Sequence, residues 1–226
     1  MMTNVVLILG GTREAAQLAQ KLVEENPKAR IISSLAGRTR EPKPIAGEIR
    51  IGGFGGADGL TNYIRENNVT RLIDATHPFA VNISRNAAIA AANTGIVFEI
   101  RRRAPWPKLK DDHWWEVEDL EAACAAIPAQ AKVLLALGSQ HIAIFTERSD
   151  VHFVVRMVDP PETRLPFAKH TLVLGTPGDT EQETALLKKH RITHIVCRNS
   201  GGEGAYAKIE AARQLCIPVI IVTPRS

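Results

Sequence analysis

The sequence predicts an α/β protein with two Rossmann-like lobes, each built on a mainly parallel sheet. Residues 5–9 form an unbroken apolar run, which is typical of a parallel strand buried on both faces. A glycine turn follows, and apolar residues then recur at helical spacing. This alternation of strand and helix repeats along the chain, and its 226 residues are enough for two compact lobes.

The first lobe is predicted to span residues 1–100. Its expected strands are 5–9, 31–35, 49–51, 72–75 and 97–100. The first helix begins after Thr12, whose hydroxyl suits an N-cap, with Glu14 in the first turn. Further helices are expected from about residue 58 to residue 67 and through an alanine-rich segment that ends at residue 93.

The second lobe is predicted to span residues 101–226, beginning with an irregular passage, 101–116, that is rich in proline and tryptophan. Its expected strands are 133–137, 152–158, 172–174, 195–197 and 219–222. Helices are expected from residue 140, over 180–190 and over 205–215, and Thr180 with Glu183 forms a predicted capping box. We expect the two lobes to meet in a cleft.

Composition excludes several classes of protein. Apolar residues make up 45% of the chain and charged residues 23%, which is ordinary for a globular protein and unlike disordered, collagenous or membrane sequences. The net charge of +4 is spread along the chain, so we expect no nucleic-acid partner and no membrane, and an anionic small molecule fits better. The three cysteines form no CxxC pair, which favours the reducing cytoplasm.

The end of the second predicted strand lacks a residue that an NAD site normally has. In such a site an Asp or Glu about 20 residues after the glycine turn binds the ribose hydroxyls. The segment IISSLAGRTREP, residues 31–42, has serines, a glycine, a threonine and arginines before its first acid. Either the protein is of another kind, or its ligand differs from NAD.

Two glycine-rich turns follow predicted strands. Gly10-Gly11-Thr12 offers backbone N–H groups at a helix N-terminus to a pyrophosphate, although a simple tight turn explains it equally well. The segment GGFGGADG, residues 52–59, has five glycines in eight positions. A loop between a strand and a helix needs only one or two, so close approach of a ligand is favoured over mere flexibility.

Polar residues follow the strand predicted at 72–75. The segment DATHPFA contains Asp74, Thr76 and His77 at the carboxyl end of that strand. Ligands of open α/β sheets bind at this edge. A structural hydrogen bond for Asp74 and a helix cap for His77 are the alternatives, and the convergence of several strand ends favours a functional site.

The second lobe contains two further candidate stretches. RNSGGEGAYAK, residues 198–208, is a strand-to-helix turn rich in small hydrogen-bond donors, with a surface turn as the alternative. RMVDPP begins with Arg156 on a strand, where a structural ion pair competes with ligand binding. No metal site is predicted, because a helix end and a strand start separate His190 from His194.

Seven stretches taken together carry a resemblance to a family. In order they are LGGTREA, SLAGRT, GGFGGADGL, DATHPFA, RAPW, RMVDPP and NSGGEGAYAKIEAAR. The chain resembles, over essentially its whole length, the precorrin-6A and cobalt-precorrin-6A reductases of cobalamin biosynthesis. The resemblance implies reduction of one double bond of a polycarboxylate tetrapyrrole, giving precorrin-6B or its cobalt form, with a nicotinamide cofactor that is normally NADPH.

The same resemblance places NADP(H) in the first lobe. Gly10, Gly11 and Thr12 would hold the pyrophosphate, while Ser34, Arg38 and Thr39 would hold the ribose phosphate. The missing acid then favours NADPH, since a carboxylate would repel the 2′-phosphate and Arg38 pairs with it. The nicotinamide half would lie near Gly53, Phe54, Gly55, Gly56, Thr76 and His77.

The resemblance also implies a substrate site. It would be formed by Arg103, Trp106, Arg156, Asn199, Ser200, Gly201 and Gly202. His77, Tyr206 and Lys208 are the candidate proton donors for a reaction in which hydride delivery is followed by protonation. Arg198 stands where the family commonly has Lys, which puts a proton-donor role there in doubt.

Two other functions remain open at this stage. One is an NADP-dependent reductase or epimerase of another anionic substrate, and the other is a non-catalytic NADP(H)-binding sensor. Motifs in both lobes favour an enzyme, because a sensor needs only the first lobe. Other enzymes of the cobalamin pathway are the expected protein partners.

Overall fold

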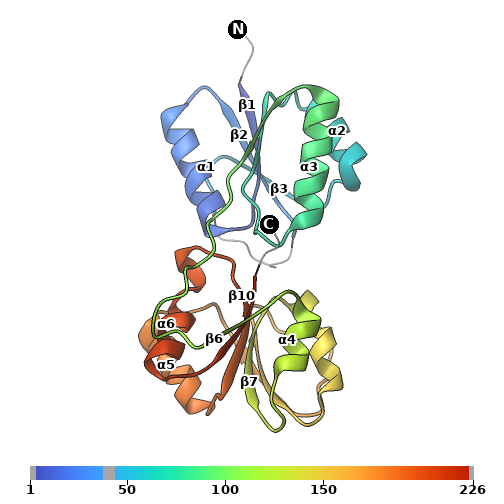
Figure 1. The fold of residues 1–226 in the computed structure, drawn as a ribbon. Coiled ribbons are helices and arrows are strands. Elements are labelled where there is room, and N and C mark those ends of the chain that lie inside the picture. The colour runs from blue at the N-terminus through green and yellow to red at the C-terminus, as the bar shows by residue number, and fades with distance from the viewer. Residues whose placement is uncertain (1–3, 38–43, 224–226) are drawn as a thin grey trace. The chain divides into compact units, whose positions relative to one another are not determined.

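The computed structural model describes residues 4–37 and 44–223. The chain divides into two compact units, Met1–Arg103 and Ala104–Ser226 (Figure 1). Each unit is an α/β layer structure in which every pair of neighbouring strands is parallel. The predicted fold class is therefore confirmed.

The first unit has a five-stranded sheet in the order β3-β2-β1-β4-β5. Its elements are β1 (Val5–Leu9), α1 (Arg13–Glu25), β2 (Arg30–Leu35), β3 (Glu48–Ile51), α2 (Gly56–Glu66), β4 (Arg71–Asp74), α3 (Val81–Thr94) and β5 (Val97–Ile100). Helix α1 packs its buried alanines on one face of the sheet, and α2 and α3 cover the other face (Figure 1). Because β1 is central, all five of its residues are buried.

The second unit has a six-stranded sheet in the order β6-β11-β10-β7-β8-β9. Its elements are β6 (Trp114–Val117), α4 (Leu120–Ala126), β7 (Lys132–Ala136), η1 (Ser139–His141), η2 (Ala143–Glu147), β8 (His152–Met157), β9 (His170–Leu174), α5 (Thr180–Lys189), β10 (His194–Arg198), η3 (Glu203–Ala205), α6 (Ala207–Gln214) and β11 (Val219–Val222). Helices α5 and α6 pack on one face. On the other face Phe145 of η2 contacts Phe153 of β8 edge-on.

Three local predictions in the second unit are wrong. The helix expected from residue 140 is two short 3₁₀ turns, and the irregular passage contains the edge strand β6. The capping box of α5 begins one residue earlier than expected, because Asp179 accepts from the backbone of Gln182 and the Gln182 side chain accepts in return. Glu183 is thereby left for another role, described below.

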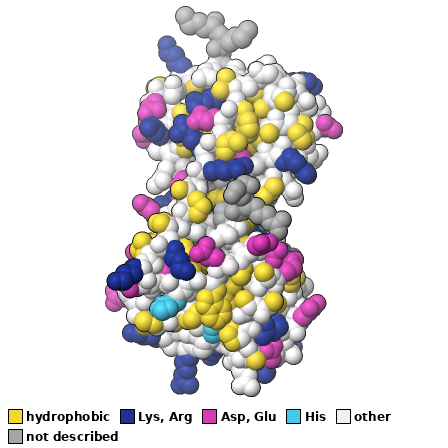
Figure 2. Space-filling model, viewed as in Figure 1, with side chains coloured by type: hydrophobic (Ala, Val, Ile, Leu, Met, Phe, Trp, Pro, Cys, Tyr) yellow, Lys and Arg dark blue, Asp and Glu magenta, His cyan; other side chains and the backbone are white. Residues whose placement is uncertain are grey.

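On the face drawn in Figure 2, Lys and Arg side chains are interspersed with Asp and Glu side chains on each unit. No helix in the described part of the chain is long and apolar enough to cross a membrane.

Histidines gather at the amino-terminal edge of the second sheet. His152, His170 and His194 begin three of its strands, and His190 caps α5. Burial lowers the pKa of His152 below its ordinary value, with positive charge on Lys132 and neighbouring histidines as the next cause. Burial also lowers the pKa values of His190 and His194. His152, His190 and His194 are therefore more costly to protonate in the folded protein than in the unfolded chain.

Stability is expected to fall as the pH drops below about 6.5. In the unfolded chain these histidines bind protons at their ordinary pKa of 6.5, whereas the folded chain binds them only at lower pH. The free energy of unfolding therefore keeps its full value above about pH 6.5, where the histidines are neutral in both states. It decreases as the pH falls from 6.5 through the lowered pKa values of the folded state. Urea unfolding between about pH 8 and 5 measures the loss, and a combined H152Q, H190Q and H194Q variant should show a flatter profile. An unchanged slope in that variant would contradict the assignment.

Candidate nucleotide site

The turn after β1 is open to a ligand. Gly11 has a φ of +101°, which favours glycine, and a Cβ built there would meet no atom within 4 Å. Gly10 is more crowded, since a Cβ there would lie 3.2 Å from that of Ala15. Its N–H donates to the carbonyl of Ser34 at 3.0 Å and fixes the turn against β2. The turn thus combines a fixed backbone with free space at the N-terminus of α1.

Thr12 has a structural task in this turn. Its hydroxyl oxygen accepts from the backbone N–H of Ala15 at 3.1 Å and donates to the carbonyl of Ala75 at 3.2 Å. The residue therefore caps α1, as the sequence predicts, and also ties the turn to the segment after β4.

The end of β2 carries two buried serines. Ser34 is 6% exposed, and Ser33 has a buried hydroxyl without a hydrogen-bond partner among the described residues. Arg38 and Thr39, which the sequence analysis assigns to the ribose phosphate, lie outside the described residues.

The glycine-rich loop after β3 leaves a second open space. Gly52, Gly55 and Gly56 have φ values of +112°, +80° and +90°. A Cβ at any of them, or at Gly53, would meet nothing within 4 Å. Gly55 is the N-cap of α2 and supplies no side-chain cap, so the first N–H groups of this helix have no capping side chain. Such a helix end favours an anionic group.

The segment after β4 holds a buried carboxylate. Asp74 is 1% exposed, and its Oδ1 accepts from the backbone N–H of Thr76 at 3.1 Å and from its hydroxyl at 2.6 Å. Its Oδ2 is buried and has no partner among the described residues. A buried unpaired carboxylate oxygen is costly, and a donor from a bound ligand would satisfy it.

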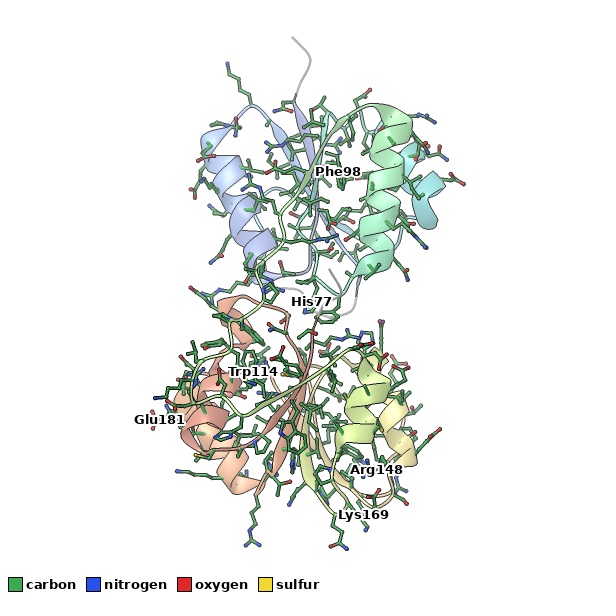
Figure 3. All side chains as sticks on the ribbon, viewed as in Figure 1. His77, Phe98, Trp114, Arg148, Lys169 and Glu181 are labelled. Carbon is green, nitrogen blue, oxygen red and sulfur yellow. The ribbon has the colours of Figure 1, made fainter. Side chains whose placement is uncertain are left out.

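His77 follows in the same loop, which Figure 3 shows at the end of the first sheet. Its Nδ1 accepts from the backbone N–H of Phe79 at 3.3 Å, and the two rings are 5.7 Å apart between centroids. An accepting Nδ1 places the proton of a neutral imidazole on Nε2. In this tautomer Nε2 is a hydrogen-bond donor.

These segments converge because the strands are parallel. Leu9 at the end of β1 pairs with Ser34 on one side and with Asp74 on the other, and Ser34 pairs with Arg50 of β3. The glycine turn, the glycine-rich loop and the Asp74 segment therefore follow neighbouring strands at one sheet edge. Open space, two uncrowded glycine turns and an unpaired oxygen fit a dinucleotide at this edge.

Arg103, a predicted substrate residue, forms an ion pair within the first unit. Its Nη1 lies 2.9 Å from Oε2 of Glu14, in the first turn of α1. The guanidinium is thus held near the N-terminus of the helix that follows the glycine turn.

In the second unit, Trp106 and Asn199 form a buried clamp. The Asn199 side chain accepts from the backbone N–H of Trp106 at 2.7 Å and donates to its carbonyl at 3.1 Å. The indole Nε1–H of Trp106 donates to the carbonyl of Gly202 at 2.8 Å. Gly201 and Gly202, with φ values of +62° and +76°, continue the turn, and Ser200 is buried beside them. The structure thus brings these predicted residues together. The Asn199 side chain bonds to the backbone of Trp106, and the Trp106 side chain bonds to the turn that follows Asn199.

Lys208 is directed into the core of the second unit. It is 4% exposed, its Nζ donates to the carbonyl of Ala205 at 2.5 Å and lies 4.9 Å from the centroid of the Trp106 ring. Burial lowers the pKa of this amine. Neighbouring Tyr206 accepts a hydrogen bond at its hydroxyl oxygen from Arg213 at 2.9 Å.

Arg156 forms a buried ion pair with Glu183 of α5. The Nη1 to Oε1 and Nη2 to Oε2 distances are 2.5 Å and 2.9 Å, and the two side chains are 7% and 2% exposed. Of the two roles considered for Arg156, ligand binding and a structural ion pair, the structure shows the ion pair.

Two residues that contact the glycine-rich loop, Arg50 and Gly59, were not predicted from the sequence. Arg50 lies within β3 and bonds to the glycine-rich loop, and Gly59 lies in α2 directly against that loop. Neither stands in a motif of its own, although Gly59 is the last glycine of GGFGGADG. The described residues contain no group of three or more side chains suited to a metal ion.

A glycine turn at the carboxyl edge of a parallel sheet, in a chain of two α/β units, defines a Rossmann-like protein. Residues 5–225 match the family described as precorrin-6x reductase CbiJ/CobK. The chain belongs to that family. It is an oxidoreductase of cobalamin biosynthesis that acts on a carbon–carbon double bond, and membership implies a nicotinamide cofactor and a tetrapyrrole substrate. The family resemblance is thereby confirmed.

Individual relatives cover nearly the whole chain. Precorrin-6A reductase of Rhodobacter capsulatus is 45% identical over 96% of this chain and 86% of its own length. Precorrin-6A reductase of Rhodococcus erythropolis is 42% identical over 96% and 88%. Cobalt-precorrin-6A reductase of Priestia megaterium is 29% identical over 96% and 89%. A solved structure of CobK precorrin-6A reductase superposes with a TM-score of 0.90 at 42% identity, covering 100% of this chain and 89% of that one.

Proposed function

We propose that this protein reduces one ring double bond of precorrin-6A with NADPH and gives precorrin-6B. The observation that carries the proposal is the 45% identity to a precorrin-6A reductase over 96% of the chain. The cobalt-precorrin-6A reductase of Priestia megaterium is 29% identical over a similar length. This difference favours the metal-free macrocycle over its cobalt form.

The first unit would hold the cofactor, which supplies hydride when bound. Gly11 leaves room for the pyrophosphate at the N-terminus of α1, where Gly10 fixes the turn, and the loop from Gly53 to Gly56 leaves room beside α2. Thr76 and His77 would approach the nicotinamide half. The role of the protein is to orient the cofactor and to exclude water from the reacting carbon atoms.

NADPH is favoured over NADH by the residues that follow β2. Ser34 is the last residue but one of that strand, and Arg38 and Thr39 follow a few positions later with no acid before them. A guanidinium pairs with a 2′-phosphate, which an acidic residue would repel. Ser34, Arg38 and Thr39 would therefore bind the ribose phosphate.

The proton that completes the reduction would come from a side chain or from water. Of the three candidates, His77 is favoured because of its place: it follows β4 at the carboxyl edge of the first sheet, where the cofactor would bind, and as an imidazolium it would be a proton donor there. Lys208 and Tyr206 are engaged by Ala205 and Arg213. In the second unit, the turn formed by Ser200, Gly201 and Gly202 would contribute to substrate binding.

Reaction with each macrocycle separately tests this function. Purified protein and NADPH should convert precorrin-6A, with NADPH absorbance and the macrocycle spectrum changing together, and cobalt-precorrin-6A should react more slowly. A His77→Gln variant should bind NADPH normally and lose single-turnover rate about a thousandfold, the middle of the range for a general acid. A lack of oxidation with either macrocycle would overturn the assignment in favour of another anionic substrate or a sensor.

The cellular setting is also part of the proposal. We place the protein in the cytoplasm with other enzymes of the pathway as partners. The cysteines Cys124, Cys197 and Cys216 are all unpaired, which supports a reducing compartment.

A further inference from the structure

We propose that Arg50 is a specificity-determining residue that binds the 2′-phosphate of NADPH. The inference rests on the proposed use of NADPH. It adds a charged group from β3 to a site that sequence motifs place only after β2.

The position of Arg50 follows from strand register. Arg50 pairs with Ser34 across the β2–β3 ladder, and paired residues of parallel strands face the same side of the sheet. The guanidinium Nη1 lies 3.5 Å from the Ser34 hydroxyl oxygen. Ser34 lies near the end of β2, which is where an NAD-binding protein has its ribose-binding acid. Arg50 therefore brings positive charge to the place where the 2′-phosphate would lie.

Its guanidinium is held in one orientation. Nη1 donates to the carbonyl of Gly52 at 2.5 Å and Nη2 donates to the carbonyl of Gly53 at 2.8 Å. The Cζ atom lies 3.7 Å from the centroid of the Phe54 ring and 5.1 Å from that of Tyr63. A side chain already ordered in this way loses little conformational entropy when an anion binds.

The charge of Arg50 is not neutralised by a carboxylate among the described residues. Other arginines of the first unit form ion pairs, namely Arg30 with Glu48, Arg71 and Arg101 with Glu99, and Arg103 with Glu14. Arg50 instead bonds to neutral oxygens of Ser34, Gly52 and Gly53. A half-buried cation whose described partners are all neutral attracts a phosphate more strongly than one already paired.

The alternative role is purely structural, since the same bonds organise the glycine-rich loop. The two roles differ in their dependence on the 2′-phosphate. A loop organiser affects any adenine nucleotide, whereas a phosphate ligand affects only nucleotides that carry the 2′ group. Adenosine 2′,5′-bisphosphate and AMP differ in that group alone and are suitable probes.

Calorimetric binding of both probes tests the proposal. Arg50→Gln is expected to weaken binding of adenosine 2′,5′-bisphosphate roughly tenfold to a hundredfold, the range for one charge-assisted bond, and to leave AMP within about threefold. Arg50→Lys keeps the charge without the fork of donors and should fall between wild type and Arg50→Gln. Arg65→Gln is the matched control, because Arg65 donates to the carbonyl of Asn93 at 3.1 Å and has no place at this site.

Equal losses for the two probes in Arg50→Gln would overturn the proposal, as would equal affinity of the wild type for both. If Arg50→Gln fails to fold, Arg50→Lys decides in the same way. The proposed function fails separately: discrimination between the probes without reduction of either macrocycle would leave Arg50 as a phosphate ligand in a protein with another substrate. If the protein reduces a macrocycle with NADH and binds the two probes equally, the reductase function stands and the role of Arg50 fails.

Discussion

A Glu183→Ala variant is expected to unfold with a free energy about 3–5 kcal/mol below that of the wild type. Glu183 is 2% exposed and binds both terminal nitrogens of Arg156. Its Oε1 also accepts from the backbone N–H of Gly178 at 3.0 Å, at the start of α5. Removing the carboxylate leaves a buried guanidinium without its partner and a backbone N–H unsatisfied. Both losses act in the same direction, which makes this effect the largest expected for stability.

The loss of unfolding free energy in Glu183→Ala is measured by urea unfolding, with tryptophan fluorescence as the signal. All tryptophans of the chain, Trp106, Trp114 and Trp115, lie in the second unit, so the signal reports on that unit alone. Glu181→Ala is the matched control, because Glu181 is exposed on the same helix (Figure 3). It should change the unfolding free energy by less than about 0.5 kcal/mol.

The apolar pair Arg156→Met with Glu183→Leu separates charge from packing. Replacing both members of a buried ion pair by hydrophobic residues of similar size is often neutral, whereas removing one is costly. The double variant is therefore expected to recover most of the stability lost in Glu183→Ala. A single variant as stable as the wild type would show that the ion pair is not a net contributor.

The fold was largely predictable because buried parallel strands have a strong sequence pattern. Residues 5–9 and 219–222 are apolar throughout, and both are fully buried strands. The edge strand β6 was missed, because only Trp114 of its residues is buried and prolines and charges surround it. A helix was predicted to start at residue 140, since short 3₁₀ turns share apolar spacing with an α-helix over so few residues.

The parts of the candidate site that could be predicted are the turns whose backbone conformation requires glycine. Glycines with positive φ stand out in a sequence, and Gly11 and Gly52 led to both turns. The partner of a polar side chain cannot be inferred in this way. Asn199 was assigned to the substrate, yet its amide binds the backbone of Trp106, 93 positions away. Arg50 was missed for the same reason, because its importance depends on which carbonyls lie nearby in space.

A Gly59→Ala variant is expected to be destabilised by about 2 kcal/mol and to bind NADPH at least tenfold more weakly. In an ordinary helix interior this substitution stabilises by about 1 kcal/mol, so the expected sign is the opposite of the usual one. A Cβ built on Gly59 would lie 1.7 Å from the carbonyl oxygen of Phe54 and 2.8 Å from its carbonyl carbon. Backbone atoms cannot rotate away as a flexible side chain does. The glycine-rich loop must therefore shift away from α2, together with the Phe54 ring that stacks on Arg50.

Gly53→Ala provides the comparison within the same loop, because a Cβ there meets nothing within 4 Å. It should unfold like the wild type in a circular-dichroism melt, whereas Gly59→Ala should melt at a lower temperature. Hydrogen exchange over residues 52–56 should quicken in Gly59→Ala, since the carbonyls of Gly52 and Gly53 lose their fixed contact with Arg50. Calorimetry with NADPH completes the test. A Gly59→Ala protein that is more stable than the wild type and exchanges at the same rate would mean that helix propensity, and not the close approach of the loop, governs this position.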